Sequence, residues 1–361
     1  MAAPPAGLHT IANLHSEAAD AVARIFCNLV QHRKERQVDD PRARIRTGLE
    51  EILRCDDEAM PAALDAVLTE DCIFDVSHPI ERLEGREAIG RGFFGPLRRA
   101  FTSVRRRDEI FLGGPNRRGE GETWMAAVTH YVGTFADRMA GIPPSQRLAF
   151  LRGGEFYRIE GGRIAQARII LDLPDLMRQA GRPPFPPMLG TEMLFPGPAT
   201  HDGVCPANGD GARSLDLVEA MLADLQDFDP ETFDSRDQTG EGGYWHPDML
   251  WYGPGGIGST YRWEGFVKDH RAPFLSAFPD RRGGNHYCRI GDGNYAAVSG
   301  WPSMTKTHLG DYLGVPATGK RLTLRVMDFY RCEAGRIIEN WVLLDYVDLF
   351  RQMGVDLLRG P

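Results

Sequence analysis

The segment that decides the fold is FYRIEGGRI at residues 156–164, because it recurs as FYRCEAGRI at residues 329–337. The same offset relates residues 171–181 to residues 344–354, and both of these stretches begin with Leu-Asp and end with Gly. A repeat that holds its register over two separate blocks indicates a duplication rather than a chance match. The chain is therefore predicted to contain two tandem copies of one fold.

Upstream of these blocks the two copies match in a second register, which is four residues longer. It pairs Phe101 with Phe278 and Asp71 with Asp248. One unit thus spans about 110 residues, which is the size of a domain rather than of a solenoid repeat.

The chain of 361 residues divides into four predicted parts. Residues 1–65 carry apolar residues at helical spacing, which indicates an N-terminal helical extension. The two copies occupy residues 66–181 and 215–361. Residues 182–214 lie between them and are rich in proline and glycine, a composition that interrupts helices and strands and indicates a linker.

The composition is that of a folded globular protein, with 42% hydrophobic and 25% charged residues. The net charge of −8 and the absence of a basic stripe argue against nucleic acid as a partner. The six cysteines form no C-x-x-C pair and no cluster of zinc spacing, and no nucleotide or phosphate motif stands out, so we expect neither metal nor cofactor. Without a signal peptide pattern at the start or a long apolar run, we expect a soluble, cytoplasmic protein that does not enter a membrane.

The order of predicted elements indicates an α+β fold. In each copy a helical opening precedes an apolar stretch, a second amphipathic helix and then strands. The row Leu322, Leu324, Val326, Asp328 and Tyr330 alternates on one face of a strand, and a final helix over 346–353 ends at Gly354. Helices followed by a meander of antiparallel strands are typical of α+β domains.

Four stretches of the second copy carry a family resemblance: residues 277–280, 307–310, 314–320 and 335–341. With them, each copy resembles a SnoaL-like polyketide cyclase domain of the NTF2-like superfamily. The resemblance implies two tandem cone-shaped α+β barrels, each a curved antiparallel sheet wrapped around helices. Because that superfamily contains cyclases, isomerases, hydrolases, dehydratases and proteins without catalysis, the fold leaves the reaction open.

The first copy departs from the family pattern at three positions. It has Phe135 where the second copy has His308, Arg168 in place of Trp341, and Gln166 in place of Glu339. We therefore look for activity in the second copy first.

Asp345 is the acid/base residue that the resemblance implies, because the family places an aspartate at the end of its last strand. A carboxylate at the end of an apolar strand also loses hydration, which raises its pKa towards a value useful for proton transfer. The alternative is an N-cap for the helix that starts at Tyr346, and Asp172 in the first copy has the same design before Leu173. Both roles can coexist in one residue.

Asp328 continues an apolar row, where an unpaired charge is costly. It must therefore be paired, protonated or in contact with a wet cavity. Arg325 lies on the opposite face of the strand and is an awkward partner. The first copy has Arg152 and Glu155 at the same places, so a structural polar network and a pocket role both remain open for Asp328.

His308 and Tyr330 are candidates to hold an enolate oxygen, since each can donate a hydrogen bond near neutral pH. For His308 the alternative is a loop histidine. Further candidates share polar or aromatic side chains suited to a flat apolar ligand, although core packing is the alternative for each aromatic residue. In the second copy these are Trp251, Tyr252, Trp301, Arg325 and Trp341, and in the first copy His78, Trp124, His130, Arg152, Glu155 and Asp172.

These residues together predict a cofactor-independent enzyme that abstracts a proton next to the carbonyl group of a hydrophobic cyclic or polyketide-like compound, as a cyclase, isomerase or lyase would. Two alternatives are a small-molecule binding protein without turnover and a scaffold whose cavity is filled by side chains. We also expect the two copies to pair as an internal pseudo-dimer, and a homodimer is a further option.

Overall fold

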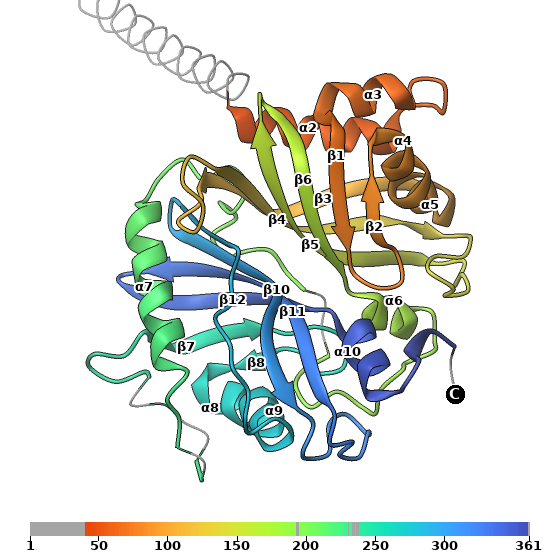
Figure 1. Cartoon of the computed structure of the whole chain (residues 1–361). Coiled ribbons are helices and arrows are strands. Elements are labelled where there is room, and N and C mark those ends of the chain that lie inside the picture. Colours follow the sequence, from red (N-terminus) through yellow and green to blue (C-terminus); the bar gives the residue numbers. More distant parts are fainter. Residues whose placement is uncertain (1–39, 193–194, 230, 233–234, 236–237, 360–361) are drawn as a thin grey trace, which may run out of the picture. The chain divides into compact units, whose positions relative to one another are not determined.

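The computed structural model describes residues 40–192, 195–229, 231–232, 235 and 238–359 (Figure 1). Residues 1–39 of the predicted N-terminal extension lie outside the described residues. Residues 45–361 group into one compact unit, which contains both copies of the duplication.

Each copy forms a six-stranded sheet, and the two sheets repeat one strand order. The first sheet has the order β2-β1-β6-β5-β4-β3 and the second β8-β7-β12-β11-β10-β9. The duplication and the α+β class predicted from the sequence are thereby confirmed. The strands of the first sheet are β1 (Leu68–Val76), β2 (Glu81–Glu84), β3 (Phe101–Pro115), β4 (Thr123–Phe135), β5 (Leu148–Glu160) and β6 (Arg163–Leu171); those of the second are β7 (Trp245–Tyr252), β8 (Thr260–Tyr261), β9 (Cys288–Asp292), β10 (Tyr295–Thr307), β11 (Arg321–Glu333) and β12 (Arg336–Leu344).

The sheets differ from the predicted antiparallel barrels in one respect: they are open and mixed. The first and last strands of each copy pair in parallel, β1 with β6 and β7 with β12, while all other neighbours are antiparallel. A parallel pair needs a long connection, and the helices and strands between the first and last strand of each copy supply it.

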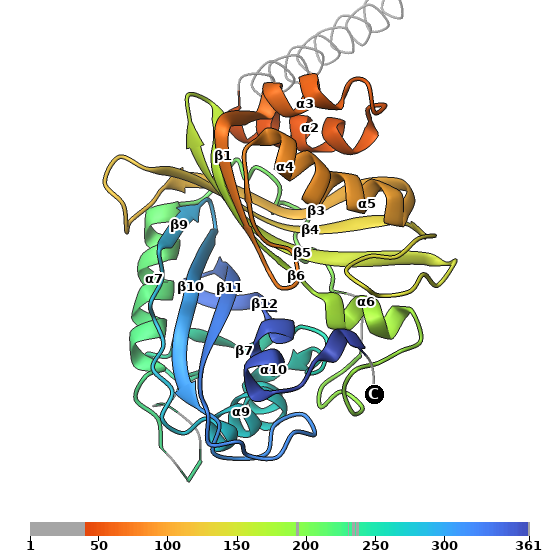
Figure 2. The same ribbon diagram turned by 45° about the vertical axis from the view of Figure 1, so that its right-hand side comes forward.

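Helices cover one face of each sheet (Figure 2). In both copies the central helical segment contains a π-helical turn, η1 (Gly90–Phe94) or η2 (Val267–Arg271), between two short α-helices. Helix α7 starts at Gly211, inside the stretch that the sequence assigns to the linker. The α-helices of the first copy are α2 (Pro41–Arg54), α3 (Met60–Val67), α4 (Arg86–Ile89), α5 (Gly95–Ala100) and α6 (Leu173–Gln179); those of the second are α7 (Gly211–Asp224), α8 (Arg262–Phe266), α9 (Ala272–Ala277) and α10 (Tyr346–Met353), followed by a short 3-10 turn (Leu357–Arg359).

The buried apolar residues form three clusters. One lies between the first sheet and its helices, and a second lies between the second sheet and its helices. The third cluster combines residues of the two sheets, among them Val128, Phe156, Phe329, Trp341 and Leu343. Alternation along each strand therefore directs one set of side chains towards the helices and the other towards the neighbouring sheet.

Candidate functional site

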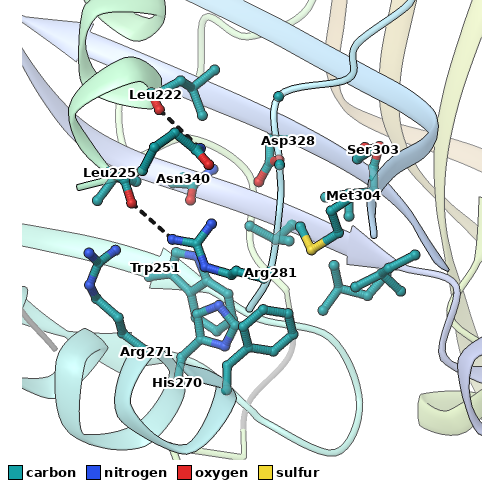
Figure 3. A pocket seen from close by; sticks show the side chains of 18 of the residues that line it. Leu222, Leu225, Trp251, His270, Arg271, Arg281, Ser303, Met304, Asp328 and Asn340 are labelled. Atoms are coloured by element: carbon teal, nitrogen blue, oxygen red, sulfur yellow. Dashed lines mark hydrogen bonds between the residues drawn. The ribbon is translucent and has the colours of Figure 1, made fainter. Parts of the chain in front are cut away.

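A cavity of about 140 Å³ lies in the second copy between the inner face of the sheet and the helical segment α8-η2-α9 (Figure 3). Its apolar wall includes Trp245, Trp251, Phe266, Phe274 and Val326. The polar side chains that line it and matter for chemistry are His270, Arg281, Asp328, Tyr330 and Asn340. A mostly apolar cavity with a few convergent polar groups is the usual form of a small-molecule site.

Asp328 lines this cavity from the middle of β11. The predicted row is confirmed, because Leu324, Val326 and Tyr330 line the same cavity. Burial raises the pKa of Asp328 to about 7, and a hydrogen bond from Asn340 offsets this only in part. Within the described part of the chain, no arginine, lysine or histidine forms an ion pair with this carboxyl group, so it exchanges its proton near neutral pH.

Tyr330 stands two residues further along the same strand face and is 3% exposed. Burial, and after it the nearby Asp328, raises the pKa of its phenol well above the ordinary value. The hydroxyl group therefore keeps its proton at neutral pH and can donate a hydrogen bond into the cavity.

His270 is a cavity residue that the sequence interpretation missed. It lies in η2, and its ring stacks on Trp251 with the centroids 4.3 Å apart. Burial lowers the pKa of His270 to about 3, so the imidazole is neutral, and its buried Nδ1 has no hydrogen-bond partner within the described structure. The signal was available: Phe266, His270 and Phe274 are spaced four residues apart and share one face of a helical segment.

Asp345 forms the predicted N-cap of α10 and does not line the cavity. Its carboxylate accepts a hydrogen bond from the backbone N–H of Asp348 and forms an ion pair with Arg325 Nη1 at 3.0 Å. Burial raises the pKa of Asp345 to about 6, against the lowering effect of Arg325. The cap is thus confirmed, and the proton-transfer role implied by the resemblance stays a prediction.

The other predicted residues of the second copy lie away from the cavity, except Trp251 and Tyr330. His308 is fully buried and contacts Thr318 Oγ1 through Nδ1 at 3.1 Å. Tyr252 and Trp341 pack against one another in the cluster between the sheets, with tilted rings whose centroids are 5.0 Å apart. Trp301 packs against that cluster, and Arg325 lies over its ring.

In the first copy, Glu155 occupies the position of Asp328 but is fully paired. Arg106 Nη2 lies 2.6 Å from its carboxylate, and the hydroxyl groups of Tyr131 and Tyr157 donate to it. Arg106 also pairs with Asp108 at 2.7 Å, and all of these side chains are buried. The group at this position is therefore held as part of a polar network in the core.

The remaining predicted residues of the first copy are separate from this network. His78 contacts Glu81 at 2.9 Å, and Trp124 donates to Glu122 at 2.8 Å. His130 is 3% exposed, and burial lowers its pKa. The structure does not gather these residues around one cavity.

Arg152 and Asp172 form one half of a reciprocal contact between the copies. Arg152 pairs with Asp172 at 3.5 Å and donates to the carbonyl of Gly253, while Asp172 caps α6 and accepts from the backbone of Gly255. Both glycines lie in the loop after β7 of the second copy.

The other half of the contact uses the equivalent residues of the second copy. Arg325 pairs with Asp345 and reaches Glu81, which follows β1 of the first copy, at 3.5 Å. Each copy thus presents an Arg-Asp pair to the segment that follows the first strand of the other: the loop after β7 in one case and the start of β2 in the other.

The family comparison agrees with this architecture. The model of the SnoaL-like polyketide cyclase family matches residues 43–180 and 223–353, more than half of the chain, so the chain belongs to this family, with two tandem members in one polypeptide. The first match begins inside α2 and includes α3.

Solved structures with similar folds include a putative hydroxylase, AclR, from Streptomyces galilaeus, with 21% identity over 40% of this chain and 98% of that one at a TM-score of 0.30. The putative polyketide cyclase IdmH from Streptomyces antibioticus has 24% identity over 38% of this chain and 98% of that one, with a TM-score of 0.29. TsrD from Streptomyces laurentii has 21% identity over 39% and 96%, with a TM-score of 0.32. No curated protein matches the chain.

Two further observations concern only the described residues. No group of three or more His, Cys, Asp or Glu side chains is arranged to hold a metal ion. None of the helices seen there is long and apolar enough to cross a membrane.

Proposed function

We propose that the second copy is a cofactor-independent acid/base catalyst, which moves a proton next to the carbonyl group of a hydrophobic compound, as in aldol cyclisation or isomerisation. The observation that carries this proposal is Asp328, a carboxyl group in an apolar cavity with its pKa raised to about 7. A general base or acid works best when its pKa is close to the working pH.

In the proposed mechanism the carboxylate of Asp328 takes the proton from the carbon next to the carbonyl group. The electron pair of the broken C–H bond forms the enolate, whose oxygen accepts hydrogen bonds from Tyr330 and from the N–H of neutral His270. Donors placed where charge develops stabilise the transition state more than the ground state. The enolate carbon then attacks a second carbonyl carbon, whose C=O π bond breaks and whose oxygen takes the proton from the acid form of Asp328. In an isomerisation the enolate instead regains that proton at another position.

The volume of the cavity limits the size of the ligand part that the cavity can enclose. Its volume of about 140 Å³ is close to that of the engineered apolar cavity, about 150 Å³, that binds benzene. The reacting part of the substrate is therefore about one ring in size, enclosed by Trp251 and the other apolar residues of the wall.

The proposal transfers the proton-moving role from Asp345 to Asp328. Asp345 is engaged by Arg325 and by the first turn of α10, whereas Asp328 faces the cavity and forms no ion pair within the described structure. His270 likewise takes the donor role that the sequence suggested for His308, because His270 lines the cavity.

The test is the exchange of α-protons of cyclohexanone with D₂O, followed by NMR at saturating ketone. We expect the protein to accelerate exchange, with an inflection near pH 7, and Asp328→Asn to slow it by about 10² to 10⁴-fold. Asp311→Asn, which removes an exposed carboxylate of the same copy, is the matched control and should keep full activity.

Two results would contradict the proposal. Full exchange activity in Asp328→Asn would remove the assigned base. Exchange no faster than in buffer, although the ketone raises the midpoint of thermal unfolding, would favour a binding protein without turnover.

We also propose that the two copies form an internal pseudo-dimer. The apolar cluster shared by the two sheets and the reciprocal Arg-Asp contacts support this pairing. Hydrogen exchange of the full chain tests it, because the backbone amides of Gly255 and of β12 should then be protected together. Fast exchange at Gly255 beside a protected β12 would contradict the pairing.

A further inference from the structure

Arg281 is a cation at the cavity that has no acidic partner. It follows α9 and lines the cavity, with its guanidinium group directed towards Leu225 (Figure 3). One hydrogen bond from Nη2 to the carbonyl oxygen of Leu225, 2.9 Å long, and a contact with the ring of Phe228 hold it in place. No Asp or Glu of the described residues lies within ion-pair distance of it.

Three other buried or partly buried arginines of the second copy have acidic partners. Arg289 contacts Glu219 at 2.9 Å, Arg325 contacts Asp345 at 3.0 Å, and Arg331 contacts both Glu333 and Glu339. Burial lowers the pKa of Arg281, and no neighbouring acid counteracts this effect. A cation without a counter-charge in a largely apolar site is costly unless something bound there supplies the negative charge.

The geometry of the guanidinium group suits a carboxylate. Its five N–H donors form a planar fork that binds both oxygens of a carboxylate group, and only one nitrogen is committed to Leu225. Asp328 does not supply the charge, because no ion pair joins the two residues in the described structure. Arg281 and Asp328 thus offer two separate polar ends within one apolar cavity.

We propose that Arg281 binds a carboxylate group of the ligand, so that the substrate class is a ring-sized carbonyl compound that also carries an acid. The inference rests on the proposed function for the position of the reacting carbonyl at Asp328. Arg271 lines the same cavity and donates to Ser235. The carboxylate fixes the orientation of the ring and directs the opposite end of the molecule towards Asp328.

The test compares benzoate with its neutral analogue benzamide by isothermal titration calorimetry on the full chain. We expect benzoate to bind at least about 10-fold tighter than benzamide, and Arg281→Gln to remove this preference while benzamide binding is unchanged. Arg282→Gln is the matched control, because Arg282 is the adjacent residue, is exposed, and forms no side-chain hydrogen bond or ion pair within the described structure. Arg281→Lys should keep part of the preference, since the charge stays and the fork is lost.

Several outcomes would overturn the inference. One is equal affinity of the wild-type chain for benzoate and benzamide, or no benzoate binding at 10 mM, about the weak limit for a specific anion site. Equal weakening of both ligands by Arg281→Gln would indicate a packing role, and tighter binding of phenyl phosphate than of benzoate would exclude a carboxylate as the natural group. Since binding is measured without turnover, a failed proton-exchange assay with an intact benzoate preference would reject the catalytic proposal alone.

Discussion

The two copies place an acid at the same position of equivalent strands. One acid is paired with a cation in the core, and the other faces a cavity without an ion pair in the described structure. Glu155 in β5 is surrounded by Arg106, Tyr131 and Tyr157, all of which bind its carboxylate. Asp328 in β11 faces a cavity of about 140 Å³ and receives one hydrogen bond, from Asn340. The same fold thus uses one position for a closed ion-pair network in the first copy and for an open polar site in the second.

The difference can be traced to residues that precede and form the neighbouring strand β10. In the first copy, Arg105 pairs with Val132 across β3 and β4, and Arg106 is the next residue. In the second copy, the residue equivalent to Val132 is Thr305, which forms a bridge with Arg282, so the position of Arg106 is taken by Gly283. Gly283 lines the cavity. The loss of this arginine, together with Met304 at the position of Tyr131, leaves both the space and the unpaired acid that a site requires.

The largest predicted effect is the loss of stability that follows when the acid of the first copy is replaced. Glu155→Gln leaves Arg106 buried with only part of its counter-charge, which should cost about 3 to 5 kcal/mol of the free energy of unfolding. Asp328→Asn removes an acid that has no cation, so it should change stability by less than about 1 kcal/mol at pH 6, or increase it. Urea unfolding of both variants measures the two effects, and a similar loss in both would show that the two acids have the same structural role.

Much of this comparison follows from the sequence. The repeated block around Tyr157 and Tyr330 predicts the duplication, and the alternation in β11 places Asp328 on the inner face. The caps at Asp172 and Asp345 follow from residues that precede a helix. These features are local, because each depends on neighbours within one strand or one helical turn.

The features that the sequence did not predict depend on pairing between strands. Asp328 lies opposite Val342 in the register of β11 and β12, and directly opposed residues share a face, so Trp341 points the other way, to the neighbouring sheet. Likewise, Gly283 and Arg281 belong to the region between the two repeat registers, where the copies differ in length. Without the strand register, neither the face of Trp341 nor the opening at Gly283 can be assigned.

The second prediction concerns the pH dependence of stability that the unpaired Asp328 should cause. The pKa of Asp328 is about 7 in the folded state, and an aspartate in an unfolded chain has a pKa of about 3.9. Between these values the folded state binds a proton that the unfolded state has released, so this contribution to stability is complete below the unfolded pKa and is lost as the pH rises through the folded pKa. Because the carboxyl group is in part accessible from the cavity, we expect a loss of about 2 kcal/mol between about pH 5 and pH 8.

The measurement is the free energy of unfolding in urea, taken as the difference between the wild-type chain and Asp328→Asn at each pH. Taking this difference cancels the contributions of groups that titrate equally in both chains. A difference that stays constant over this range would mean that the pKa of Asp328 is not raised. The proposed base would then lack the pKa near neutral pH on which the proposal depends.

The smallest predicted effect is on the pKa of Asp328, when the second copy is given the arginine that the first copy has. Gly283→Arg restores a guanidinium group at the position of Arg106, and the nearest atom to an added Cβ is Gln226 Nε2 at 3.5 Å, so the backbone can carry a side chain. We expect the new cation to lower the pKa of Asp328 by about 1 to 2 units, and to move the inflection of the proton-exchange profile to lower pH by the same amount.

Gly242→Arg is the control for this change, because an added Cβ at Gly242 meets no atom within 4 Å and the residue lies outside the cavity lining. It should leave the inflection unchanged. An inflection that stays near pH 7 in Gly283→Arg would mean that the arginine at this position does not reach the acid, and that the divergence of the two copies depends on the strand as a whole. A downward shift would instead show that an arginine at this position reaches Asp328, as Arg106 reaches Glu155 in the first copy.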